Sequence, residues 1–126
     1  MMPAKLSEEV ELLRKDGAEV EVIEEGTRFY VVLKGFQLPN GTYRPASTDL
    51  MVIADYQYPL SRLDMYWTDP HVRLPSGALP QAADQFEQYA ARRWQRWSWH
   101  YPSWDPALHN LRTHVEVFRD RLARGN

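Results

Sequence analysis

Ser98 and His100 are the residues of this chain best placed for covalent chemistry. They lie in the tryptophan-rich segment 94–101, whose sequence is WQRWSWHY. If this segment is a strand, the alternation of side chains puts Arg96, Ser98 and His100 on one face. A hydroxyl can act as a nucleophile when an imidazole accepts its proton, and a guanidinium can stabilise the negative charge that develops. The three side chains therefore form a candidate catalytic set.

The tryptophans of this segment allow other interpretations. Trp97 and Trp99 would lie on the opposite face of the same strand. They either pack as a structural aromatic layer, with Ser98 and His100 merely solvated, or they hold a partner protein. Alternating aromatic and arginine residues also stack on single-stranded nucleic acid, but the net charge of −2 argues against a nucleic-acid partner. The residues alone leave the catalytic and the partner-binding interpretations open.

No metal or cofactor site is expected. The sequence has no cysteine, which excludes thiolate metal sites, iron–sulfur clusters, disulfides and cysteine nucleophiles in these 126 residues. His109 and His114 are five positions apart, which on a helix turns them about 140° away from each other. No glycine-rich phosphate loop is present. Asp69 and His71 follow an expected strand and are weaker candidates for a site, because Asp69 is also a common turn residue.

The composition predicts one folded domain over residues 1–126. Hydrophobic residues make up 44% of the chain and charged residues 25%, which is typical of a globular protein and not of a disordered one. No apolar run approaches the roughly 20 residues of a membrane helix, and the N-terminus has no apolar signal region. We therefore expect a soluble, cytoplasmic protein without membrane contact.

A helix and four strands are expected in the first half of the chain. Residues 6–16 have an apolar face of helical spacing, with Ser7 as the cap and Gly17 as the end. Strands are expected where apolar residues alternate or form short runs, at 18–24, 28–36, 48–56 and 63–67. Their short connections favour an antiparallel meander.

The second half is expected to be irregular up to a final helix. Residues 68–92 are rich in proline and form a long loop, with a helical turn at 82–91. The last helix is expected at 106–123, with Asp105 as the cap and Pro106 in the first position. Its apolar stripe consists of Leu108, Leu111, Val115, Phe118 and Leu122. The expected fold class is α+β: an N-terminal helix, a four-strand antiparallel meander, a long irregular loop and a C-terminal helix.

These elements and several short motifs resemble a ubiquitin-conjugating enzyme domain. Tyr58-Pro59-Leu60 resembles the family's Tyr-Pro motif after the third strand, and Trp104-Asp105-Pro106-Ala107-Leu108 resembles the Trp-Ser-Pro-Ala-Leu entrance to its crossing helix. The pattern is most similar to the bacterial branch called prokaryotic ubiquitin-conjugating family E. Residues 94–102 match its WQRWS-then-HxP stretch, and residues 111–113 match its LRT-type final helix. The resemblance covers nearly the whole chain and implies the same fold.

The missing cysteine changes what the resemblance implies about activity. Members of the family carry the C-terminus of a ubiquitin-like protein as a thioester on a cysteine. That cysteine lies shortly before the tryptophan that corresponds to Trp104 here. Here the matching window is 96–98, where Ser98 carries the only hydroxyl. The His-Pro-Asn signature is also absent, and Asp69-Pro70-His71 is only a loose substitute. Two alternatives remain: a transferase that carries the ubiquitin-like protein as an oxyester on Ser98, or a non-catalytic subunit that docks an activating enzyme or a ubiquitin-like protein.

The resemblance also implies partner surfaces. A ubiquitin-like protein and an activating-enzyme-like protein are the expected partners. The first helix, with Arg14 and Lys15, would face the activating enzyme. Tyr58-Pro59-Leu60 and Ser103-Trp104-Asp105 would form the two loops that dock ligases in the family. The last helix, with His109, Arg112 and Glu116 exposed, would contact the ubiquitin-like protein.

Overall fold

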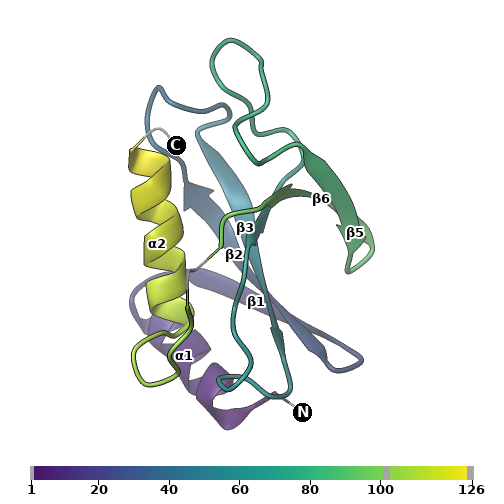
Figure 1. Cartoon of the computed structure of the whole chain (residues 1–126), viewed down its shortest axis with the longest axis vertical. Coiled ribbons are helices and arrows are strands. Elements are labelled where there is room, and N and C mark those ends of the chain that lie inside the picture. The colour runs from purple at the N-terminus through teal and green to yellow at the C-terminus, as the bar shows by residue number, and fades with distance from the viewer. Residues whose placement is uncertain (1, 101–102, 125–126) are drawn as a thin grey trace.

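The protein is an antiparallel sheet with two helices on one side, as the computed structural model of residues 2–100 and 103–124 describes it (Figure 1). The strands pair in the order β1-β2-β3-β4-β6-β5, and every pair is antiparallel. No helix among the described residues is long and apolar enough to cross a membrane. The elements are α1 (Ala4–Lys15), β1 (Glu19–Glu25), β2 (Arg28–Gln37), β3 (Ser47–Asp55), β4 (Tyr66–Thr68), β5 (Gln85–Tyr89), β6 (Arg92–Trp97) and α2 (Leu111–Ala123).

The α+β class and the meander are confirmed, because β1 to β4 pair in sequence order. The first helix begins earlier than predicted, at Ala4, with Pro3 at the cap position and no side-chain cap. Ser7 therefore lies inside the helix and is not its cap. Gly17, with φ of +99°, lies just beyond the end of α1, as expected of a residue without Cβ.

Each face of the sheet carries its own apolar cluster. On the face toward the helices, called the helix face, residues such as Val31 and Leu50 pack against α1 and α2. The opposite face, called the outer face, has a smaller buried cluster, because side chains alternate along each strand. The outer-face cluster consists of Tyr30, Val32, Met51, Trp67 and Trp94.

The predicted helical turn at 82–91 is wrong. Residues 85–97 form a hairpin, in which β5 pairs with β6 and β6 pairs with β4. Ala90 and Ala91 make its tight turn with φ of 50° and 60°. Turns of this kind normally use Gly or Asn, so an Ala-Ala pair carries no turn signal in the sequence. The predicted fourth strand also shifts, from 63–67 to Tyr66–Thr68.

The last helix starts later than predicted. Asn110 caps α2 and accepts a hydrogen bond from the backbone N–H of Thr113, whose hydroxyl in turn accepts one from the N–H of Asn110. Asp105 and Pro106 instead belong to a turn before the helix. Leu108 is consequently 68% exposed and is not part of the apolar stripe. A reciprocal cap at Asn110 outcompetes the Asp-Pro start, because it satisfies two helix-end groups at once.

Candidate functional site

Ser98 lies directly after β6 and its hydroxyl is bound by arginine. Nε of Arg96 donates a hydrogen bond of 3.1 Å to Oγ of Ser98. Nη1 of Arg96 also donates to Glu87 at 2.9 Å, and the other carboxylate oxygen of Glu87 accepts from Trp67 Nε1 at 2.8 Å. A continuous polar chain thus runs across β6, β5 and β4. It brings Arg96 and Ser98 together but places both in a network that joins strands.

His100 pairs with an acid that the sequence analysis missed. Its Nδ1 lies 3.0 Å from both carboxylate oxygens of Asp64, and its side chain is 54% exposed. An acid that holds Nδ1–H leaves Nε2 as the basic nitrogen, as in hydrolase triads. Among the described residues, however, Ser98 Oγ and His100 share no hydrogen bond. Asp64 carries no motif, and only the pairing of distant segments could have identified it.

A neighbour of each of these polar groups lines one cavity on the outer face. It has a volume of about 260 Å³, and its wall includes Met65, Trp67 and Tyr89. Asp64, the partner of His100, also lines it. Trp67 joins it to the Glu87–Arg96–Ser98 chain through its indole N–H. Neither Ser98 nor His100 lines the cavity itself, and each is linked to it only through hydrogen bonds to Trp67 or Asp64.

Trp97 and Trp99 do not form a surface. Their exposed fractions are 0% and 3%, and both rings contact Phe118 of α2 in the helix-face core. Nε1 of Trp97 donates to Thr68 at 2.8 Å, which satisfies its polar atom inside the protein. This burial corrects the expectation that the two tryptophans hold a partner. Tyr101 and Pro102, which complete the motif, lie outside the described residues.

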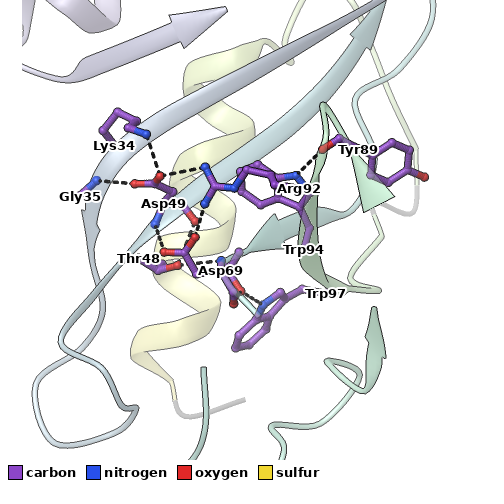
Figure 2. A network of polar contacts seen from close by, with 10 residues as sticks. Lys34, Gly35, Thr48, Asp49, Asp69, Tyr89, Arg92, Trp94 and Trp97 are labelled. Carbon is purple, nitrogen blue, oxygen red and sulfur yellow. Dashed lines mark hydrogen bonds and ion pairs between the residues drawn. The ribbon is translucent and has the colours of Figure 1, made fainter. Parts of the chain in front are cut away.

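Asp69 belongs to a charged network at the edge of the outer face (Figure 2). Its carboxylate pairs with the guanidinium of Arg92, which also contacts Asp49 at 3.3 Å. The same guanidinium lies 4.0 Å from the ring centre of Trp94, so it stacks on the outer-face cluster. The network attaches the β5–β6 hairpin to β3 and to the segment after β4, which is a structural role.

Asp49 is the centre of this network. Burial opposes its ionisation, but hydrogen bonds from Lys34, the Gly35 N–H and Arg92 outweigh burial and lower the pKa of its carboxyl. The same contact with Asp49 raises the pKa of Lys34. The two groups therefore stay ionised at neutral pH. His71 stands apart from all of these contacts, on an exposed turn.

The two predicted docking loops meet. Nε1 of Trp104 donates to the carbonyl of Pro59 at 2.9 Å, and the ring of Trp104 lies 6.3 Å from that of Tyr58. Tyr58 itself is buried and donates from its hydroxyl to Glu9 of α1. Leu60 is 81% exposed and Asp105 is exposed as well. The two loops thus form one surface. Leu60 and Asp105 are its solvent-exposed residues, and the buried Tyr58 anchors it to α1.

The two basic residues of the first helix differ in their surroundings. Arg14 donates from Nη2 to the carbonyl of Val20 at 2.7 Å and also pairs with Glu11. It therefore fastens the end of α1 to the edge of β1. Lys15 is exposed. Of this pair, Lys15 is the one that can meet a partner without losing an internal contact.

Comparison with known proteins gives one match. A family model described as prokaryotic E2 family E matches residues 5–125. No curated protein and no solved structure gave a significant match. Among the residues that the structure describes, no group of three or more histidine and acidic side chains could hold a metal ion.

Proposed function

The chain belongs to prokaryotic E2 family E and so has a role in ubiquitin-like conjugation. Within that role, we propose that it is a binding subunit that docks an activating-enzyme-like or ubiquitin-like protein without carrying it covalently. The observation that carries this proposal is the environment of Ser98. Its hydroxyl accepts a hydrogen bond from Arg96, and no base among the described residues is bonded to it.

The chemistry of serine supports this choice. The sequence has no cysteine, so no thioester can form on these residues. A serine hydroxyl ionises far less readily than a thiol and becomes a nucleophile only when a base takes its proton. Arg96 cannot do so, because a guanidinium donates protons and accepts none. Glu87, the nearest acid in the same chain of contacts, is bonded to Arg96 and Trp67.

The joined loops at 58–60 and 103–105 supply the docking surface. Leu60 and Leu108 are the most exposed large apolar side chains of the described residues, at 81% and 68%. Asp105 precedes Leu108 by three positions and is also exposed. Because a few residues supply most of the binding energy of an interface, the contribution of these two leucines can be tested by substitution.

Intact-mass analysis tests whether the partner is bound without a covalent link. The protein is mixed with ATP and with the activating enzyme and ubiquitin-like protein of its own pathway, beside the Ser98→Ala variant. We expect a stable complex in both samples and no mass gain equal to one ubiquitin-like protein. A gain that withstands thiol reductant, is cleaved by mild base and is absent from Ser98→Ala would refute the non-covalent assignment.

The docking surface is tested with paired surface variants. Leu60→Ser combined with Leu108→Ser should weaken complex formation at least ten-fold in a titration with either partner. Leu79→Ser changes a leucine that is 40% exposed in a different loop and serves as the matched control. Equal weakening by both variants, or none by either, would show that the joined loops are not the docking site.

A second candidate is an oxyester carrier on Ser98. The observation that favours it is the contact between Asp64 and His100, which orients the imidazole as a base would be oriented. This candidate requires His100 Nε2 to reach Oγ of Ser98 when a partner is bound. It predicts the base-labile mass gain described above, with a strong loss in His100→Ala and a partial loss in Asp64→Asn.

A further inference from the structure

The outer-face cavity has a rim of four charged residues and an apolar wall. Arg28 and Asp55 face each other across β2 and β3, while Arg62 and Asp64 come from the loop before β4. Counted formally, the four charges cancel. What the cavity can bind depends on which of these charges are already paired inside the protein.

The two acids have internal partners. Asp55 accepts hydrogen bonds from the backbone N–H of Gln57 at 2.8 Å and from the hydroxyl of Ser61. Asp64 holds Nδ1 of His100 between its two carboxylate oxygens. Both carboxylates are therefore bound by donors of the chain itself, and a ligand cation would have to compete for them.

The side chains of the two arginines have no such internal partner among the described residues. Within residues 2–100 and 103–124, the guanidinium of neither Arg28 nor Arg62 forms an ion pair, a hydrogen bond or a ring contact, and both residues are exposed. A guanidinium presents a planar fork of donors that matches a carboxylate. The charge that this cavity can offer to a ligand is thus positive.

The wall restricts the rest of the ligand. Ile53, Met65 and Trp67 supply apolar surface, and the ring of Tyr89 closes one side at 5.9 Å from that of Trp67. Burial, followed by the charge of Glu87, raises the pKa of Tyr89, so its hydroxyl stays protonated. A volume of about 260 Å³ is smaller than most pockets for drug-sized molecules, so it suits a short group.

We propose that this cavity binds a carboxylate attached to a short apolar group, with Arg28 and Arg62 as the receptors of the carboxylate. A phosphate is a poorer fit, because its second charge would be repelled by Asp55 and Asp64 and its hydration is lost against the apolar wall. The carboxylate can come from the C-terminus of a protein chain or from a small acid.

The experiment is a nuclear magnetic resonance titration that follows the indole N–H of Trp67. The probes are N-acetyl-leucine, its uncharged amide, the peptide acetyl-Ala-Ala-Leu with a free carboxyl end, and inorganic phosphate. We expect saturable shifts of the Trp67 signal with the two acids and binding at least ten-fold weaker with the amide. Equal binding of acid and amide, stronger binding of phosphate, or no saturable shift with either acid would overturn the proposal.

Substitutions locate the receptor. The double variant Arg28→Gln, Arg62→Gln should bind N-acetyl-leucine at least ten-fold more weakly, while Arg124→Gln, an exposed arginine beyond α2, should leave binding unchanged. Both changed residues are exposed, and the amide comparison needs no variant at all. Unchanged binding in the double variant would overturn the assignment. Tighter binding of the peptide than of N-acetyl-leucine supports a chain terminus as the source, and equal binding supports a small acid.

Discussion

The sheet falls into two regions that reach left-handed backbone conformations in different ways. In the region from α1 to β3, every residue with positive φ is a glycine; in the region from Met65 to Ala91, most are not. The first region holds Gly17, Gly26, Gly35 and Gly41, and the second holds Met65, Ala82, Ala90 and Ala91 beside Gly77. For a residue with a Cβ, the left-handed conformation costs about 1–2 kcal/mol of free energy.

Side-chain contacts hold the second region in place. Arg92 stacks on Trp94 and pairs with Asp49 and Asp69, which attaches the strained hairpin to the rest of the sheet (Figure 2). His114 of α2 donates from Nε2 to the carbonyl of Met65 at 3.0 Å. The difference shows that local backbone preference shapes the first region, whereas tertiary contacts override that preference in the second.

The largest expected effect comes from removing the anchor of the hairpin. Trp94 is fully buried, so Trp94→Ala should lower the free energy of unfolding by about 3–5 kcal/mol. Hydrogen exchange should also speed up most strongly at the amides of β5 and β6. Urea denaturation measures the first quantity and exchange by mass spectrometry the second. A loss below about 1 kcal/mol would show that the hairpin is held by other contacts.

His114 should make the second region sensitive to acid. Burial lowers its pKa from 6.5 to about 4 in the folded protein, so the unfolded chain takes up a proton first as the pH falls. The free energy of unfolding therefore has its full value, as far as His114 is concerned, above pH 6.5. It declines by about 3 kcal/mol as the pH falls to 4.

The variant His114→Gln isolates this contribution. Urea denaturation of the two proteins at several pH values gives the difference between their free energies of unfolding. That difference should shrink as the pH falls from 6.5 to 4, because carboxylates titrate alike in both proteins. A difference that stays constant over this range would mean that His114 does not titrate as its burial requires.

Exchanging turn residues between the regions tests the comparison directly. Ala91→Gly should raise the free energy of unfolding by about 1 kcal/mol, because glycine adopts positive φ without strain. Gly26→Ala should lower it by a similar amount, since its φ is +63° although the space around a new Cβ is empty. Opposite shifts of the urea midpoint are expected, and equal signs would mean that the two turns do not differ in strain.

The smallest effect is expected at the edge of the first region. Arg14→Gln removes the contact of its guanidinium with the carbonyl of Val20, but that side chain is 41% exposed. We expect a loss of about 0.5 kcal/mol in the free energy of unfolding, which urea denaturation can resolve. A loss above about 2 kcal/mol would show that this region also depends on a single side-chain anchor.

Local signals explain which elements could be predicted. The alternation of β1, the apolar run of β2 and the glycines between elements placed the first three strands within a few residues. The hairpin at 85–97 was missed because Ala90 and Ala91 give no turn signal, and the start of α2 was misplaced because Asp105 resembles a cap. Both errors lie where a local preference competes with a stronger contact.

The candidate site divides in the same way. Ser98, His100 and Arg96 could be selected from residue type and spacing, because a strand puts alternate residues on one face. Asp64, which binds His100, and Glu87, which binds Arg96, could not be selected in this way. Trp97 and Trp99 had been open to either a buried or a partner-binding role, and only their packing against Phe118 resolves it.

The sequence by itself determined the α+β class, the resemblance to its family and the exclusion of thioester chemistry, because composition, periodicity and the absence of cysteine need no knowledge of contacts. The tertiary structure alone decided that Ser98 is bound by Arg96, that His100 is held by Asp64 and that Asp64 lines a cavity together with Arg28 and Arg62. Hydrogen bonds and charges act over a few ångströms in space, and residues 36 positions apart, such as Asp64 and His100, come within that range only when the chain folds.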